Sequence, residues 1–298
     1  MQRFFNHETP FKTMEIISKI AELKKAVEQA RQNGLTIGLV PTMGALHAGH
    51  LSLIERARHE CGFVVVSIFV NPTQFNNQSD LATYPRTAEE DCAKCAEAGV
   101  DVVFMPEVEE IYPEPDTRVF DLGEVAAVME GAMRPGHFNG VAQIVSKLFD
   151  YVQPDRAYFG EKDYQQIAVI RRMAELTGFK GEIVACPICR EVDGLAMSSR
   201  NVRLTAFHRS QAPLIHETLL AAADLAETGV DLQSVKEMVV DELDSTEGME
   251  VEYFEIADAK TLQPIENWNE AGSDGAIGCI AVWMGDVRLI DNIKFPAK

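Results

Sequence analysis

The chain has 298 residues, of which 46% are hydrophobic and 24% charged, as is ordinary for a globular protein. Its 46 acidic residues outnumber the 27 basic ones, and the formal net charge of −19 opposes binding to the phosphate backbone of nucleic acids. The longest apolar run, residues 63–70, is too short to cross a bilayer, and the first residues lack the pattern of a signal peptide. We therefore expect a cytoplasmic protein that binds neither nucleic acid nor membrane.

Helical and strand patterns alternate in the first half of the chain. Apolar residues at helical spacing from Ile16 to Ala30 predict a helix that ends at Asn33-Gly34. Strands are predicted at 35–40, 63–70, 100–105, 156–159 and 182–185, with helices at 50–59, 89–99, 141–151 and 164–178. This alternation is typical of an α/β fold with a Rossmann-like doubly wound parallel sheet.

The pattern changes near residue 187. Two helices are predicted at 205–228 and 232–243, and three antiparallel strands at 251–257, 277–284 and 287–291. We therefore expect a Rossmann-like domain at 14–187 and a smaller C-terminal α+β domain at 188–298. Residues 1–13 precede an internal methionine and are predicted to form a poorly ordered leader.

Six cysteines in a chain of this size predict free thiols in a reducing compartment. Two CxxC pairs, Cys92/Cys95 and Cys186/Cys189, leave a zinc ribbon as an alternative. The first pair lies in an alanine- and glutamate-rich helical stretch, and the two pairs are far apart in the sequence. Buried thiols are therefore the favoured interpretation.

Two histidines follow the predicted strand at 35–40. The spacing of His47 and His50 places both imidazoles on one face at a helix start, where free N–H groups and the helix dipole favour phosphate. Gly49 between them permits close backbone approach. The imidazoles can donate hydrogen bonds to phosphate oxygens as charge grows on them. Surface or zinc-ligating histidines are the alternatives.

Two further segments carry groups that suit a nucleotide. Lys162 and Asp163 lie between a strand and a helix, where the ammonium suits phosphate and the carboxylate suits ribose hydroxyls. Ser198, Ser199 and Arg200 offer two hydroxyls and a guanidinium that can bind a triphosphate. Taken alone, the first pair fits simple helix capping and the second group fits a polar turn.

Six blocks of sequence together resemble the pantothenate synthetase family, within the HIGH/KMSKS nucleotidyltransferase superfamily. The resemblance covers nearly the whole chain from Met14 onward. The blocks are PTMGALHAGH at 41–50, VSIFVNPTQF at 66–75, YPRT at 84–87, RPGHF at 134–138, YFGEKDYQQ at 158–166 and GLAMSSRN at 194–201.

The resemblance implies an enzyme that condenses (R)-pantoate with β-alanine and converts ATP to AMP and pyrophosphate. It implies a pantoyl-adenylate intermediate, Mg²⁺ on the phosphates and a homodimer. The domain at 14–187 would bind ATP and pantoate, and the domain at 188–298 would act as a lid. A closed pocket would protect the adenylate from water.

The same resemblance assigns residues. His50 takes the family's acid-type catalytic role, with His47 and Lys162 beside it. Gln74 would bind pantoate and β-alanine, and Gln166 would bind pantoate through amides that both donate and accept. The implied ATP-binding residues are Met43, Gly44, Ala45, Leu46, His47, Ala48, Gly49, His50, Gly160, Glu161, Lys162, Asp163, Cys189, Met197, Ser198, Ser199 and Arg200.

Several alternatives stay open at the level of sequence. Arg134 and His137 border the pantoate pocket or make structural turn contacts. The acidic run at 89–91 binds Mg²⁺ or is an exposed charge cluster at a helix start, and the metal ligands are otherwise unassigned. Competing functions are a nucleotidyltransferase with a phosphorylated acceptor, a tRNA-binding module and a degenerate structural homologue.

Overall fold

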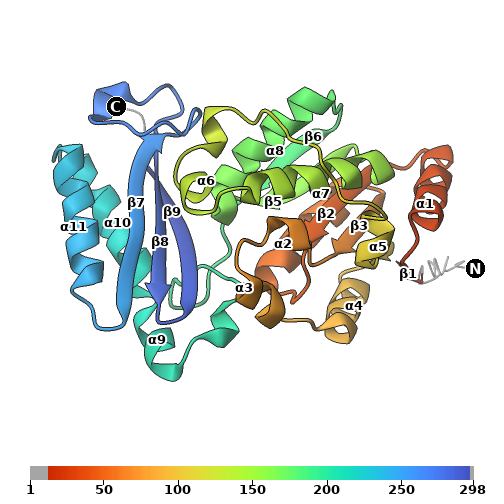
Figure 1. Cartoon of the computed structure of the whole chain (residues 1–298), viewed down its shortest axis with the longest axis horizontal. Coiled ribbons are helices and arrows are strands. Elements are labelled where there is room, and N and C mark those ends of the chain that lie inside the picture. Colours follow the sequence, from red (N-terminus) through yellow and green to blue (C-terminus); the bar gives the residue numbers. More distant parts are fainter. Residues whose placement is uncertain (1–12, 296–298) are drawn as a thin grey trace, which may run out of the picture.

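The computed structural model describes residues 13–295 and contains one parallel and one antiparallel sheet (Figure 1). The parallel sheet has six strands in the order β1-β4-β3-β2-β5-β6, with every pairing parallel. This confirms the predicted Rossmann-like α/β class. The strands are β1 (Glu15–Ile17), β2 (Ile37–Thr42), β3 (Phe63–Ile68), β4 (Val102–Phe104), β5 (Arg156–Gly160) and β6 (Glu182–Cys186).

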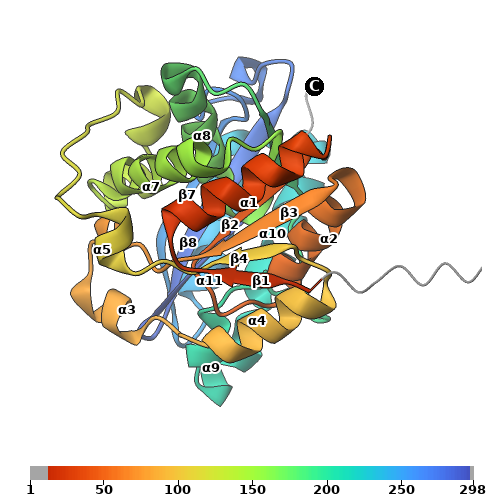
Figure 2. The same cartoon turned by 90° about the vertical axis from the view of Figure 1, so that its right-hand side faces the viewer.

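Helices cover both faces of the parallel sheet (Figure 2). One face packs against α1 (Ile20–Gln32), α7 (His137–Val152) and α8 (Tyr164–Thr177), and the other against α2 (Ala48–Glu60) and α4 (Ala88–Glu97). Alternate residues of β3 point to opposite faces of the sheet. Val65 packs on the side of α1, α7 and α8, and Val64 and Val66 pack on the side of α2 and α4. Burial on both faces is why this strand is apolar at every position except Ser67.

The prediction of one helix from Ile16 to Asn33 is wrong at its start. Ile16 and Ile17 lie in β1, an edge strand that pairs in parallel with β4, and the helix begins only at Ile20. Ile17 is 5% exposed and Ile16 59% exposed, which is the alternation of a strand. Two adjacent β-branched residues fit the helical period only by coincidence, and pairing with β4 decides their conformation.

The C-terminal part is a three-stranded antiparallel sheet covered by helices. Its core joins β7 (Met249–Asp258), β8 (Ala276–Met284) and β9 (Val287–Phe295) to α10 (Leu214–Glu227) and α11 (Leu232–Asp244). The predicted helix at 205–228 is instead two helices, α9 (Ala206–Gln211) and α10. Pro213, which has no N–H to donate, lies at the break.

The two sheets meet through buried polar contacts. In α6 (Glu130–Met133), Glu130 is 8% exposed and accepts two hydrogen bonds from Arg288 of β9, at 2.6 and 2.9 Å. Figure 1 shows α6 beside β9. Asn292 of β9 donates to the carbonyl oxygens of Glu161 and Lys162, at 2.8 and 3.0 Å. The C-terminal sheet therefore helps to fix the segment between β5 and α8.

The remaining elements are short. They are helices α3 (Gln78–Thr83) and α5 (Val108–Ile111) and the 3₁₀ turns η1 (Pro72–Gln74), η2 (Glu124–Ala126), η3 (Glu161–Asp163), η4 (Asn201–Arg203) and η5 (Trp268–Glu270). No helix within residues 13–295 has the length and apolarity to span a membrane. The predicted leader falls almost entirely on residues 1–12, outside the described part of the chain, and the domain boundary near 187 stays a prediction.

Candidate active site

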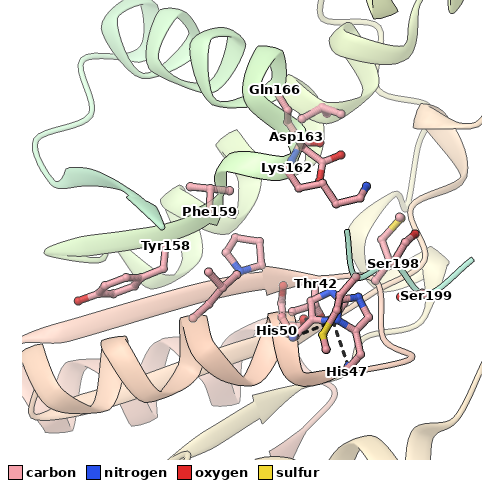
Figure 3. Close-up of a pocket in the computed structure, with 18 of the residues that line it drawn as sticks. Thr42, His47, His50, Tyr158, Phe159, Lys162, Asp163, Gln166, Ser198 and Ser199 are labelled. Atoms are coloured by element: carbon pink, nitrogen blue, oxygen red, sulfur yellow. Dashed lines mark hydrogen bonds between the residues drawn. The ribbon is translucent and has the colours of Figure 1, made fainter. Parts of the chain in front are cut away.

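A cavity of about 220 Å³ lies at the carboxyl ends of β2 and β5. The strand order reverses between these two strands, because the chain continues from β2 to β3 on one side and from β5 to β6 on the other. Open α/β sheets bind ligands at such a point. Figure 3 shows side chains from the start of α2, from the loop after β5 and from Ser198 and Ser199 around this space. The α7 side is apolar, with Val141, Ile144, Val145 and Leu148.

The two histidines are fixed by the helix start that they cap. Nδ1 of His47 accepts a hydrogen bond from the Gly49 N–H at 3.2 Å, and Nδ1 of His50 accepts from the His47 N–H at 3.3 Å. A neutral imidazole carries one N–H, so both rings hold their proton on Nε2 and are donors there. A Cβ on Gly49 would lie 2.9 Å from the His47 ring, which explains the glycine.

Both imidazoles are neutral near pH 7. Burial, followed by the nearby Lys162 ammonium, lowers the pKa of His47 to about 4. Burial, the His47 ring and then Lys162 lower the pKa of His50 to about 3. Near pH 7 His50 is therefore a hydrogen-bond donor and not a charged acid. A polyphosphate bound beside it would favour the protonated ring and raise this pKa.

Lys162 extends into the cavity from η3, between β5 and α8. Figure 3 shows its side chain directed across the space above His47 and His50. Glu161 points elsewhere and forms a salt bridge with Lys294 at 2.9 Å. The cavity thus brings one ammonium and two N–H donors together, an arrangement that suits phosphate.

Residues 197–200 close the cavity on a third side. The Ser199 hydroxyl donates to the Ala45 carbonyl at 3.1 Å, which joins this segment to the loop before α2. Arg200 pairs with Asp80 at 2.8 Å and lies over the Tyr84 ring, 5.6 Å from its centroid. The predicted ATP-binding segments, distant in sequence, therefore meet at one place.

Gln74 and Gln166 also line the cavity. Gln74 donates to the Met43 sulfur at 2.8 Å and accepts from the Asn71 amide at 3.3 Å. Asn71 is 1% exposed and accepts from the Tyr112 hydroxyl at 2.8 Å. Asn71 lies inside one of the sequence blocks, but nothing in its spacing indicated that it orients Gln74.

Arg134 and His137 are not among the residues that line this cavity. They line a second, smaller hollow of about 30 Å³ that also touches Lys162 and Gln166. Nδ1 of His137 donates to the Gln74 carbonyl at 2.8 Å. This contact supports the backbone next to the Gln74 side chain.

Comparisons with known proteins identify the family. Residues 15–294 match the sequence profile described as pantoate-beta-alanine ligase. The pantothenate synthetase of Porphyromonas gingivalis strain W83 is 60% identical over 282 residues, which cover 95% of this chain and 99% of that protein. The chain belongs to the pantoate–β-alanine ligase family. It is a ligase of pantothenate biosynthesis that joins pantoate to β-alanine at the expense of ATP.

Solved structures of the ligase family share the fold. Pantothenate synthetase from Thermus thermophilus is 46% identical, with a TM-score of 0.88 over 95% of this chain and 100% of that one. The ligase from Francisella tularensis, solved with beta-gamma ATP and beta-alanine, is 36% identical, with a TM-score of 0.80 over 95% of this chain and 98% of that one. Both therefore match this ligase along nearly its whole length.

Most of the site residues predicted for this ligase line the main cavity. The lining residues are Met43, His47, Gly49, His50, Gln74, Gly160, Lys162, Asp163, Gln166, Cys189, Met197, Ser198, Ser199 and Arg200. Gly44, Ala45, Leu46, Ala48 and Glu161 are not among the lining residues. Of the cysteines, Cys61, Cys95, Cys186 and Cys279 are buried, as predicted for structural thiols, whereas Cys92 and Cys189 are half-buried.

Proposed function

We propose that this ligase works through a pantoyl adenylate formed in the main cavity. The observation that supports this proposal most directly is that the Nε2–H donors of His47 and His50 and the Lys162 ammonium face one space where α2 begins. A pantoate carboxylate oxygen attacks the α-phosphorus of ATP and pyrophosphate leaves. The amine of β-alanine then attacks the carbonyl carbon of the mixed anhydride, so that AMP and a proton are released.

The phosphate-binding groups act on the first step. His47 and His50 donate hydrogen bonds to α-phosphate oxygens, which gain charge as the bond to pyrophosphate breaks. Lys162 and Arg200 bind the β- and γ-phosphates as cations. No proton needs to be delivered to pyrophosphate, which leaves as an anion, so a neutral His50 suits the role. Backbone atoms near Cys189 and Met197 contact the adenosine part.

The glutamines act on pantoate. The amides of Gln74 and Gln166 line the cavity beside the apolar side chains of α7. An amide donates to a carboxylate and accepts from a hydroxyl, and the apolar side accommodates the dimethyl carbon of pantoate. Gln74 also contacts β-alanine in the second step. A phosphorylated acceptor would instead need cations at this end of the cavity.

Mg²⁺ is proposed to bind mainly to the phosphate oxygens of ATP. Within residues 13–295 no three His, Cys, Asp or Glu side chains gather as a metal site. Asp163 is the one carboxylate among the described residues that line the main cavity. Asp163 and the phosphates would therefore hold the ion, which neutralises phosphate charge when bound.

The test separates the two steps. With ATP and Mg²⁺ but no β-alanine, the enzyme should release pyrophosphate when pantoate is added and not when it is left out. AMP should follow once β-alanine is added. His50→Ala should slow the first step by roughly 10²–10³-fold and leave the thermal unfolding transition in place. Pyrophosphate release without pantoate, or a His50→Ala variant as fast as the wild type, would contradict the mechanism.

A homodimer formed through the first domain and a cytoplasmic location complete the proposal. The family resemblance supports the homodimer, and the composition of the chain supports the location. Light scattering on the purified protein should give twice the chain mass of 33.0 kDa.

A further inference from the structure

Asp91 is a buried carboxylate next to the active site that the mechanism does not use. It lies on α4, is 1% exposed and is not among the cavity-lining residues. Its Oδ2 accepts from the Ala45 N–H at 2.8 Å and its Oδ1 from the Leu46 N–H at 2.7 Å. The Thr87 hydroxyl donates a third hydrogen bond to Oδ2 at 3.2 Å. Both oxygens are therefore occupied by the loop that leads to His47.

The carbonyl groups of the same loop are held as well. Lys94, three residues after Asp91 on α4, donates to the Leu46 carbonyl at 2.7 Å. The Ser199 hydroxyl donates to the Ala45 carbonyl. The peptide group between Ala45 and Leu46 is thus held by α4 through its N–H and by the loop at 197–200 through its carbonyl, and α4 also holds one group of each neighbouring peptide.

The loop needs such support because its backbone is unusual. Gly44 has φ +84° and Ala45 has φ +50°, so two successive residues are left-handed. For alanine this conformation is unfavourable, because the Cβ lies too close to the following carbonyl oxygen. The carboxylate of Asp91 offsets this cost by accepting from two successive N–H groups, which together form an anion-binding concavity. The φ of +84° at Gly44 disfavours any side chain there, and a Cβ would also come within 3.1 Å of Oδ2 of Asp91.

The loop in turn determines where the histidines lie. Leu46 is directly followed by His47, whose backbone N–H and Nδ1 make the two hydrogen bonds of the α2 cap. A shift of the peptide groups at 45 and 46 would move both rings relative to Lys162. Displacement of a catalytic group by about 1 Å can cost on the order of 10²-fold in rate.

We propose that Asp91 is a positioning residue that sets the direction of the His47 and His50 imidazoles through the backbone of residues 45 and 46. The inference rests on the phosphate-binding role proposed for these histidines. The proposal gives Asp91 a different role from its acidic neighbours Glu89 and Glu90, whose side chains are exposed. The carboxylate of Asp91 acts on the loop and not on Mg²⁺.

The test is Asp91→Asn, with Glu90→Gln as the matched control on the same helix. An amide has one acceptor oxygen, and its NH₂ group would face a backbone N–H, so one of the two backbone hydrogen bonds is lost. Pantoate-dependent pyrophosphate release should fall about 10- to 100-fold in kcat for Asp91→Asn. The KM for pantoate and the half-saturating Mg²⁺ concentration should stay within about two-fold of wild type, and Glu90→Gln should match wild type throughout.

Three results would overturn the proposal. One is an unchanged kcat in Asp91→Asn. Another is a kcat that is restored at high Mg²⁺, which would make Asp91 a metal ligand. If Asp91→Asn does not fold, Thr87→Val serves instead, because it removes only the hydrogen bond from the Thr87 hydroxyl to Asp91. This variant should lower kcat several-fold at constant KM. An unchanged kcat in Thr87→Val is the third result that would overturn the proposal. His50→Ala is measured in parallel. If His50→Ala is slow and Asp91→Asn is not, only this inference fails; if both are as fast as wild type, the proposed mechanism fails.

Discussion

Replacing His137 with asparagine should make the protein less sensitive to acid. His137 is 7% exposed, and burial, followed by the nearby Arg134 guanidinium, lowers its pKa from 6.5 to about 4. Above pH 6.5 the imidazole is neutral in both the folded and the unfolded chain, so it gives no pH dependence. Between pH 6.5 and 4 the unfolded chain binds the proton and the folded chain does not, so stability falls as the pH falls.

The magnitude follows from the two pKa values. At about 1.4 kcal/mol per pH unit, the loss amounts to about 2 kcal/mol at pH 5 and about 3 kcal/mol at pH 4. Below pH 4 the folded protein is protonated too and the loss levels off. Asparagine places an N–H group near the position of Nδ1 and so can keep the hydrogen bond to the Gln74 carbonyl, but it does not titrate.

The assay is urea unfolding at several pH values from 7 to 5. The free energy of unfolding should fall less steeply with acidification in His137→Asn than in wild type, by about 2 kcal/mol over this interval. His59→Asn, at an exposed position of α2, is the matched control and should keep the wild-type slope. Parallel curves for wild type and His137→Asn would refute the reasoning.

Two further predictions concern pantoate binding and the contact between the sheets. Gln166→Ala should raise the KM for pantoate more than the KM for ATP in steady-state assays, and equal increases would count against its assignment. Arg288→Met leaves the buried Glu130 carboxylate without its bidentate partner and should lower the free energy of unfolding by roughly 3 kcal/mol, measured with urea. Arg209→Met, which breaks the more exposed pair with Asp193, should cost less than about 1 kcal/mol, and equal losses would contradict the buried-pair argument.

The sequence by itself determined the elements that local pattern controls. The apolar run at 63–70, broken only by Ser67, predicted a strand covered on both faces, and β3 is buried on both. The three-residue spacing of His47 and His50 predicted two rings at one helix start, and the capping hydrogen bonds of α2 hold them there. These features depend on residues close in the chain, so a single sequence is sufficient for them.

Only the tertiary structure decided which distant groups meet. Ile16 and Ile17 form a strand because β4, which comes much later in the chain, pairs with them. Asn292 fixes the Lys162 loop from the opposite end of the chain. Asp91 was one residue of an acidic run with two open interpretations. Its environment became clear only once α4 packed beside the loop at residues 44–46, because a carboxylate's partners are set by the fold and leave no periodic signal in the sequence.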